Sequence, residues 1–397
     1  MRVLHIIPSV GSMRGGTSQA VLDMVKALRA DNIDAEIATT NDNGDGLLEV
    51  PLQQRIEYKQ VPIWFFLRFS PTVQAIREYA FSWQLTAWLW QNISQYDILH
   101  IHAIFSYAST MAMTIARYKN IPYIVMPHGL LCEWSLRQSP HRKEIYLKLI
   151  EKANLNNTQA VHLTSRQEQQ EIFQLGLSAV NFVLPLGLFL PNQLTNARYR
   201  LRQYLNLPTD EPVILFVSRL HPKKGLDYLI PALGKLNHHR FTFVIAGSGS
   251  KEYEAQIESL LVSNKICNRT HFVGFVEGET KNIFMQGADL FALTSHSENF
   301  AVVVLEALAA GIPVLVTPGV ALASVIQQNQ LGYVAELDVS AIASALDLYF
   351  SNPQAGKDMG NRAQQFIFEK YTWEKMASQM HQIYVDILQH KPIVASY

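Results

Sequence analysis

The sequence predicts an α/β protein made of two doubly wound domains. Short β-branched runs alternate with segments of helical spacing along the whole chain, which is the pattern of parallel sheets covered by helices. The 397 residues exceed what one hydrophobic core ordinarily holds, so two domains are expected. A second strand–helix series begins at Val213 after a polar stretch, which places the domain boundary near residue 200.

Composition excludes several classes of protein. Lys plus Arg equals Asp plus Glu at 33 each, and this balance argues against a nucleic-acid binder. Cys132 and Cys267 are the only cysteines, which suits the cytoplasm and excludes a disulfide scaffold. The apolar start of the chain is interrupted by Pro8, so we expect a first strand there rather than a signal peptide. No run of about 18 apolar residues predicts a membrane span.

The first strand is expected at Val3 to Ile7, and a glycine-rich loop follows it. Gly15 and Gly16 end that loop, and the spacing of apolar residues from Ser18 to Leu28 predicts a helix. Two glycines at this position permit close approach of a ligand to the backbone, or they serve a tight turn. The spacing alone leaves both interpretations open.

Six further strands are predicted in the first half, at Ala35–Thr39, Val61–Phe66, Asp97–His102, Tyr123–Met126, Ala160–Thr164 and Asn181–Leu184. Two helices are expected between them. One is rich in tryptophan, from Pro71 to Ile93, and the other carries mixed charges, from Trp134 to Lys152. A buried helix and a solvated helix face are the simpler interpretations. Contact with a membrane or a lipid-linked acceptor is the alternative for each.

Histidines stand at two strand ends. His100 and His102 point to the same face of a regular strand, but no third ligand stands at a useful spacing, so we predict no metal site. His128 lies between Pro127 and Gly129 in the loop after the next strand. A lone histidine in such a loop is more often structural than catalytic.

The second half begins with a strand at Val213–Val217 and a loop that carries Arg219 and Lys224. Two cations between a strand and a helix are what a departing diphosphate needs, although a basic surface loop has the same composition. The strand Thr242–Ala246 leads into Gly247 and Gly249. This turn lacks the third glycine of a dinucleotide fingerprint, so an NAD site is not expected.

The stretch Thr294–Thr317 reads as loop, helix and strand, and it follows an apolar strand. Glu298 and Glu306 are separated by seven residues, so both can face the carboxyl edge of a parallel sheet. The backbone N–H groups of residues 299–302 would then lie at a helix N-terminus and suit a phosphate. A buried helix with solvated glutamates is the alternative.

This stretch resembles the E-x7-E signature of glycosyltransferase family 4, the retaining group 1 glycosyltransferases with the GT-B fold. Asn299 and Ala301 replace glycines that are common in the family. The first glycine loop, the Asp-x-x-His-x-His run, Pro-His-Gly and the Arg-Leu-x-x-x-Lys-Gly run resemble other family motifs in the family's order. The resemblance implies two Rossmann-like domains that face a central cleft. Residues 1–200 would bind the acceptor, 201–372 the donor, and the helix in 373–397 would cross back to the first domain.

The same resemblance implies roles for individual residues. Arg219 and Lys224 would bind the diphosphate, Glu298 the hydroxyls of the donor sugar and Glu306 those of the ribose. His128 would contact a terminal sugar hydroxyl. The remaining substrate-binding positions are expected at Gly15, Gly16, His102, Gly247, Gly249, Phe275, Val276, Asn299, Phe300, Ala301 and Val302.

The implied reaction is retaining transfer of a hexose-like sugar from a UDP- or GDP-sugar to an acceptor hydroxyl, with no cofactor and no divalent metal. The family suggests polysaccharide or glycolipid biosynthesis in the cytoplasm, or at the inner face of the membrane, on a carbohydrate or lipid-linked acceptor. Three alternatives stay open: a sugar-nucleotide epimerase, a phosphorylase of the same fold, and a non-catalytic nucleotide-sugar-binding protein.

Overall fold

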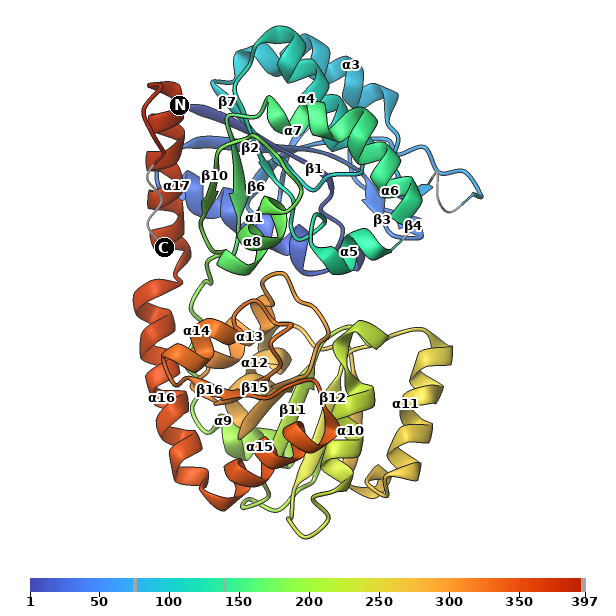
Figure 1. Cartoon of the computed structure of the whole chain (residues 1–397), viewed down its shortest axis with the longest axis vertical. Helices are drawn as coiled ribbons and strands as arrows, with labels where there is room; N and C mark the ends of the chain where they lie inside the picture. The colour runs from blue at the N-terminus through green and yellow to red at the C-terminus, as the bar shows by residue number, and fades with distance from the viewer. Residues whose placement is uncertain (74–76, 139, 394–397) are drawn as a thin grey trace. The chain divides into compact units, whose positions relative to one another are not determined.

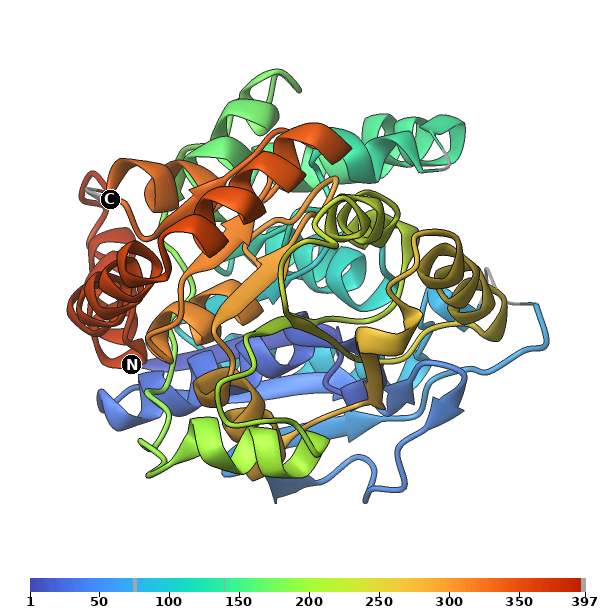
Figure 2. The same cartoon turned by 90° about the horizontal axis from the view of Figure 1, so that it is seen from below.

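The computed structural model describes residues 1–73, 77–138 and 140–393, and it divides into two compact units (Figure 1). Unit 1 comprises Met1–Gly187 together with the chain from Trp373 onward, and unit 2 comprises Leu188–Thr372. Each unit contains a sheet of predominantly parallel strands with helices packed against it, as Figures 1 and 2 show. The predicted α/β class with two Rossmann-like domains is therefore confirmed.

The sheet of unit 1 has eight strands in the order β10-β9-β8-β7-β1-β2-β6-β5. All neighbouring strands are parallel except β5 and β6. The strand order reverses direction between β1 and β7, which lie side by side at the centre. The strands are β1 (Arg2–Ser9), β2 (Asp34–Thr40), β5 (Arg55–Tyr58), β6 (Val61–Phe66), β7 (Ile98–His102), β8 (Tyr123–Met126), β9 (Ala160–Leu163) and β10 (Asn181–Val183).

The helices of unit 1 begin where serine or glycine residues follow the strands. The hydroxyls of Ser82, Ser106 and Ser165 each accept a backbone N–H of the first turn, which is the usual N-cap arrangement. The helical segments are η1 (Ser12–Arg14), α1 (Gly16–Ala30), α3 (Trp83–Asn92), η2 (Ile93–Gln95), α4 (Tyr107–Lys119), α5 (Glu133–Arg137), α6 (Pro140–Tyr146), the π-helical turn η3 (Leu147–Glu151), α7 (Lys152–Asn156), α8 (Arg166–Phe173) and α17 (Trp373–Leu388).

Two predicted helices are shorter than their sequence patterns. The helix expected from residue 71 to 93 is interrupted: Arg77 and Glu78 are helical, a turn follows, and α3 begins at Trp83, where Ser82 caps it. Residues 74–76 of that prediction lie outside the described residues. The helix expected from 134 to 152 is divided into α5, α6, η3 and α7, with residue 139 outside the described part. The fully buried Glu151 ends the π-helical turn and accepts from the hydroxyl of Thr110 at 2.7 Å.

A small hairpin follows β2. Strands β3 (Asp42–Asn43) and β4 (Gly46–Leu47) pair antiparallel. Asp42 is buried and pairs with Arg14 at 2.6 Å and with the buried Arg68. Because Arg14 directly precedes Gly15, this buried ion pair holds the glycine loop that follows β1.

The sheet of unit 2 has six parallel strands in the order β13-β12-β11-β14-β15-β16. Its order reverses between β11 and β14, again at the centre. The strands are β11 (Val213–Val217), β12 (Thr242–Ala246), β13 (Thr270–Gly274), β14 (Leu290–Leu293), β15 (Val314–Val316) and β16 (Gly332–Val334).

Unit 2 begins earlier than the predicted boundary at residue 200. Helix α9 packs on α12, and its buried Arg202 donates to the carbonyl of Gly287 and pairs with Asp289. These contacts assign α9 to unit 2. The helical segments of the unit are α9 (Ala197–Leu205), η4 (Pro222–Lys224), α10 (Leu226–Gly234), α11 (Lys251–Ser263), η5 (Cys267–Arg269), α12 (Gly278–Gly287), α13 (Val302–Ala309), α14 (Ala323–Gln328), α15 (Val339–Ser351) and α16 (Pro353–Lys370).

The last helix, α17, belongs to unit 1 and packs on α1. Its Tyr384 is fully buried, and His381 Nδ1 lies 2.6 Å from a carboxylate oxygen of Asp31. No helix in the described ranges is long and apolar enough to cross a bilayer.

Gly187 allows the backbone of unit 1 to contact the start of α17, so its replacement tests this packing. A Cβ at Gly187 would lie 2.6 Å from the Cα of Trp373, whereas a Cβ at Gly46 would meet nothing within 4 Å. We expect Gly187→Ala to lower the free energy of unfolding by about 1–3 kcal/mol and Gly46→Ala to leave it nearly unchanged. Urea denaturation of both variants measures the difference, and equal stabilities would contradict the packing.

Candidate functional site

Both sheets reverse their strand order at a point where parallel strands leave a crevice for ligands. In doubly wound sheets, ligands bind at the carboxyl ends of the two strands that flank this reversal. In unit 2 these strands are β11 and β14, and the loops that follow them carry Arg219, Lys224 and Glu298. The predicted donor residues therefore stand at the expected edge of the sheet.

The loops after β11 and β14 touch through their backbones. The Thr294 hydroxyl donates to the carbonyl of Gly225 at 2.8 Å, and the N–H of His296 donates to the carbonyl of Lys223 at 2.9 Å. Gly225 has φ 68°, and a Cβ there would lie 1.9 Å from the carbonyl oxygen of Thr294. Only glycine permits this approach, which brings Lys224 next to the second loop.

Lys224 and Glu298 form an ion pair across these two loops. Lys224 Nζ lies 2.5 Å from Glu298 Oε1, and the side chains are 15% and 13% exposed. The Ser295 hydroxyl donates to the same carboxylate oxygen at 3.1 Å. The Glu298 backbone is fixed as well, since its N–H donates to the carbonyl of Gly319 at 2.7 Å. Two residues that the sequence singled out separately thus form one rigid charged group.

The loop after β11 is strongly electropositive. Burial and the nearby charges of Arg219, Lys224 and Lys223 lower the pKa of His221. His221 Nδ1 accepts the N–H of Lys223 at 3.1 Å at the start of η4. Arg219 is exposed, and no carboxylate of the described residues lies within ion-pair distance of it. Its guanidinium is free to bind an anion.

The glycines after β12 shape this edge of the sheet. A Cβ at Gly247 would lie 1.8 Å from the carbonyl oxygen of Ser218, and a Cβ at Gly249 would lie 2.5 Å from that of Leu220. Their N–H groups donate to the carbonyl of Gly274 at 2.7 Å and to Glu254 at 2.8 Å. The turn is therefore required for packing, and neither glycine N–H is left for a ligand.

Glu306 has a cationic partner that the sequence analysis missed. Lys281 Nζ lies 2.7 Å from both carboxylate oxygens of Glu306. Lys281 stands on α12, 25 residues before its partner, and no local motif marks it. On the loop after β13, Phe275 is 72% exposed, whereas Val276 is buried.

The start of α13 differs from its sequence expectation in one respect. The side chain of Phe300 is buried and its ring centroid lies 6.4 Å from that of Tyr371, so a ligand could meet only its backbone. Ala301 has φ 55°, the left-handed conformation that a glycine would adopt without cost. For alanine this conformation costs on the order of 1 kcal/mol. Asn299 and Val302 flank this turn and are partly exposed.

Unit 1 places its predicted glycines and His128 after the carboxyl ends of β1 and β8. Gly15, with φ 78°, and the exposed Gly16 follow β1 and begin α1. His128, with φ 54°, follows β8 and is half-buried. The hydrogen bond from the Gly129 N–H to the buried Glu168, at 2.8 Å, anchors its loop.

The side chain of His102, to which the family resemblance assigns substrate binding, is fully buried. Its Nδ1 lies 3.0 Å from His128 Nε2 and its Nε2 lies 2.9 Å from His5 Nδ1. His5 was missed because it stands on β1, far from the other histidines in the sequence. The strand register, which pairs His5 with His100, brings them together.

The sequence argues against a metal site because no third ligand stands at a useful spacing. The structure corrects that argument, since it supplies a third histidine. His5, His100 and His102 place one ring nitrogen each within 4.8 Å of one another. The inward nitrogens of this trio are mostly engaged in hydrogen bonds with other histidines and with Tyr384. Burial lowers the pKa of all three imidazoles, so they are neutral near pH 7.

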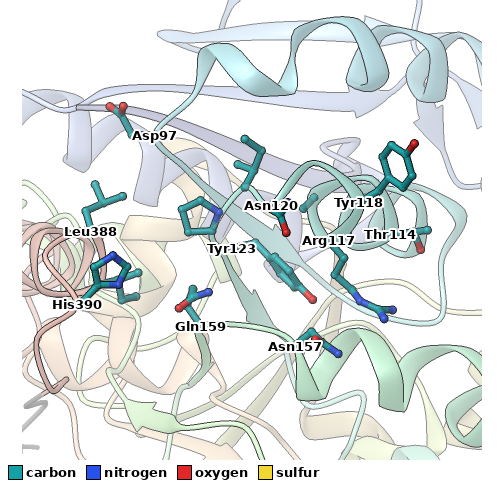
Figure 3. A pocket seen from close by; sticks show the side chains of 14 residues that line it. Asp97, Thr114, Arg117, Tyr118, Asn120, Tyr123, Asn157, Gln159, Leu388 and His390 are labelled. Carbon is teal, nitrogen blue, oxygen red and sulfur yellow. The ribbon is translucent and has the colours of Figure 1, made fainter.

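A cavity of about 860 Å³ lies elsewhere in unit 1 (Figure 3). Asp97, Tyr123 and Gln159 line it at the amino ends of β7, β8 and β9, together with Arg117 and His390. His102 and His128 stand at the opposite, carboxyl ends of these strands. This cavity is therefore distinct from the predicted site.

Comparison with known sequences agrees with the site geometry. A family described as "Glycosyl transferases group 1" matches residues 198–366, and a "Glycosyl transferase 4-like domain" matches residues 15–187. The chain belongs to the group 1 glycosyltransferases. The two matches cover both units and every residue of the predicted site.

Characterised and uncharacterised glycosyltransferases are among its relatives. An uncharacterised glycosyltransferase of Methanocaldococcus jannaschii is 34% identical over 46% of this chain and 47% of its own. The chain therefore spans about half the length of that relative. A D-inositol 3-phosphate glycosyltransferase of Xylanimonas cellulosilytica is 25% identical over 95% of this chain and 93% of its own.

Several solved structures share the fold of this chain. The sucrose-phosphate synthase of Thermosynechococcus elongatus has a TM-score of 0.80 at 20% identity, over 98% of this chain and 100% of its own. The Anabaena protein HepE, in complex with UDP and glucose, has a TM-score of 0.76 at 20% identity, over 96% and 98%. At this identity the likeness establishes the fold alone.

The buried histidines of unit 1 predict acid sensitivity. His5 and His162 have pKa values lowered to about 3 and about 4, and those of His100 and His102 are also lowered, against about 6.5 in an unfolded chain. Above pH 6.5 both states are neutral and stability is complete. As the pH falls below 6.5, only the unfolded chain binds protons, so each histidine costs about 1.4 kcal/mol per pH unit.

Urea denaturation between pH 7.5 and 5.5 should therefore show a steep loss of stability with net uptake of protons on unfolding. A free energy of unfolding that is constant over this range would contradict neutral, buried imidazoles.

The left-handed backbone of Ala301 predicts that a glycine at this position is tolerated or stabilising. Ala301→Gly relieves the left-handed strain and should leave the free energy of unfolding unchanged or raise it by up to about 1 kcal/mol. Ala309→Gly, in a buried and regular turn of the same helix, should lower it by about 1 kcal/mol or more. Chemical denaturation compares the two. If Ala301→Gly is as destabilising as Ala309→Gly, position 301 is not strained.

Proposed function

We propose that this protein transfers a sugar, with retention of anomeric configuration, from a nucleotide-diphosphate sugar to an acceptor hydroxyl. The observation that carries this proposal is the Lys224–Glu298 pair beside Arg219 at the strand reversal of unit 2. A diphosphate needs fixed cations, and a sugar needs fixed hydrogen-bond acceptors. This edge of the sheet offers both within one group of side chains.

Arg219 and Lys224 would act on the leaving group. When the bond between the anomeric carbon and the phosphate oxygen breaks, negative charge grows on the diphosphate, and nearby cations stabilise that charge in the transition state. Glu298 holds Lys224 at 2.5 Å, so the lysine needs no rearrangement to stabilise the negative charge on the diphosphate. No divalent metal is required for this step.

Glu298 and Glu306 would hold the sugar and the ribose through their hydroxyls. Carboxylates accept hydrogen bonds strongly, and each is oriented by a lysine, Lys224 or Lys281. Lys281 would keep the Glu306 carboxylate fixed while the ribose hydroxyls donate to it. Phe275, which is exposed on the loop after β13, would meet the nucleobase.

Glu298 is a poor candidate for a covalent nucleophile, because Lys224 and Ser295 already bind its Oε1. We therefore favour a same-face displacement. The acceptor oxygen bonds to the anomeric carbon, the phosphate oxygen leaves with the bonding electrons, and the leaving phosphate takes the proton of the acceptor hydroxyl. Every atom and charge is then accounted for without a protein base.

The donor and acceptor classes follow from relatives and remain part of the proposal. HepE is described in complex with UDP-glucose, which supports a UDP-sugar donor, and a GDP-sugar is the second candidate. Relatives named glycogen synthase and D-inositol 3-phosphate glycosyltransferase support a carbohydrate or an inositol phosphate as acceptor. Gly15, Gly16 and His128 would contribute to substrate binding from unit 1.

A lipid-linked acceptor gains support from the surface of unit 1. Ile145 and Leu149 on α6 and η3 are 59% and 76% exposed, and the basic Arg142 and Lys148 lie beside them in the sequence. Apolar side chains flanked by cations suit peripheral contact with an anionic membrane surface. A fully solvated helix would not need these apolar residues.

Lys224 provides the direct test of the reaction. A thermal-shift panel of UDP- and GDP-sugars first identifies the donor, and transfer is then measured with that donor. Lys224→Ala should lower kcat by about 100-fold or more while the fold is kept. The control Lys235→Ala removes a lysine at the end of α10 and should leave kcat unchanged.

Near-normal transfer by Lys224→Ala would remove the leaving-group role. The product also separates the alternatives: an isomerised nucleotide-sugar indicates an epimerase, release of a sugar phosphate indicates a phosphorylase, and binding without turnover indicates a sensor.

A further inference from the structure

Five histidines line one region of unit 1, and the proposed reaction uses only one of them. They come from β1, β7, the loop after β8, and β9, and they are His5, His100, His102, His128 and His162. Their ring nitrogens form two separate hydrogen-bonded chains. One chain runs Tyr384–His100–His162–Leu184, and the other runs His5–His102–His128.

The first chain has a fixed direction. The carbonyl of Leu184, 2.7 Å from His162 Nε2, can only accept, so His162 carries its proton on Nε2. Neutral His162 must then accept at Nδ1 from His100 Nε2 at 3.3 Å. His100 in turn accepts at Nδ1 from the Tyr384 hydroxyl at 2.7 Å. Both ends of this hydrogen-bonded chain have a partner, the Tyr384 hydroxyl and the Leu184 carbonyl, and the chain links α17 to the sheet.

The second chain has no such carbonyl, and two proton arrangements satisfy its internal bonds. In the first, His5 donates from Nδ1 to His102, and His102 donates from Nδ1 to His128. In the second, both bonds run in the reverse direction, and His5 carries its proton on Nε2. The two arrangements differ in which ring nitrogen carries the proton in each of the three histidines.

The surroundings of His5, at the buried end of the second hydrogen-bonded chain, favour one of the two proton arrangements. His5 is fully buried, and its Nε2 has no hydrogen-bond partner among the described residues. In the reverse arrangement this atom is an N–H donor without an acceptor, which is rare in protein interiors. In the forward arrangement it is a bare lone pair, which is better tolerated. The forward direction is therefore preferred, and it leaves the His128 proton on Nδ1.

We propose that His5 and His102 are positioning residues that hold His128 as its Nδ1–H tautomer, so that His128 donates a hydrogen bond to a substrate oxygen. This inference rests on the proposed function, in which His128 contacts a sugar hydroxyl. His128 Nε2 is occupied by His102 at 3.0 Å, and the anchored Gly129 fixes the loop on its other side.

The tautomer restricts what His128 can do in the reaction. Burial lowers its pKa to about 3, so it stays neutral at physiological pH. With a proton on Nδ1 and a bonded lone pair on Nε2, it offers a donor and no free base. It would accept a sugar with an oxygen at the contacted position and discriminate against the deoxy analogue.

Histidine NMR on the full chain reads this tautomer without any substrate. In protein labelled with ¹⁵N-histidine, a long-range ¹H–¹⁵N spectrum distinguishes protonated from unprotonated ring nitrogens, and His128→Asn assigns the signals. We expect His128 to show a protonated Nδ1 and an unprotonated Nε2. A proton on Nε2 of His128 in the wild-type protein overturns the inference.

Two substitutions of His102 form a matched pair. The amide of His102→Asn can still donate near the position of Nδ1, whereas His102→Leu cannot. We expect His102→Leu to give a mixture of His128 tautomers and a 10- to 100-fold lower kcat/KM, and His102→Asn to keep the tautomer and stay within about threefold of wild type. Equal kcat/KM and equal spectra for the two variants would overturn the positioning role.

The outcomes separate this inference from the proposed function. Transfer that depends on Lys224, combined with a reversed His128 tautomer, refutes only the inference. The expected tautomer, combined with no transfer from any nucleotide-sugar of the panel, refutes the proposed function and with it the role of His128 toward a substrate.

Discussion

The close approach of Gly225 to Thr294 is the constraint on which the arrangement of unit 2 depends. A side chain at position 225 would overlap the Thr294 carbonyl, with a Cβ only 1.9 Å away. Because the two backbones touch, the loops after β11 and β14 share one surface, and Lys224 reaches Glu298. Gly247, packed on Ser218, adds the loop after β12 to the same surface. Charge placement in this unit therefore follows from backbone packing at glycines.

Much of the fold could be predicted from the sequence, because buried parallel strands are continuous apolar runs between turn residues. Strands β6, β8, β11 and β12 have the predicted bounds. The β3–β4 hairpin could not be predicted, since it depends on the burial of Asp42 by two arginines from other segments. The π-helical turn Leu147–Glu151 likewise ends at the buried Glu151, whose contact with Thr110 helical spacing does not encode.

The site residues likewise fall into those that the sequence could predict and those that it could not. Motifs within one loop, such as those of Arg219 and Lys224 or of Glu298 and Glu306, are readable because their residues are close in the sequence. Lys281 and His5 are not, because each meets its partner only through helix packing or strand register. His102 shows the converse case: a family motif marks it, but its side chain is buried and hydrogen-bonds to His128.

The position of α17 has a consequence for the order in which the chain acquires structure. Tyr384 bonds to His100 inside unit 1, and Trp373 packs on Gly187, whereas unit 2 is made entirely of the residues between Leu188 and Thr372. On a ribosome, unit 2 has all of its residues before unit 1 does, although its synthesis begins later. The amino-terminal sheet must wait, with the face around His100 open to solvent, until α17 emerges to cover it. Unit 1 can therefore be completed only after all of unit 2 has been synthesised.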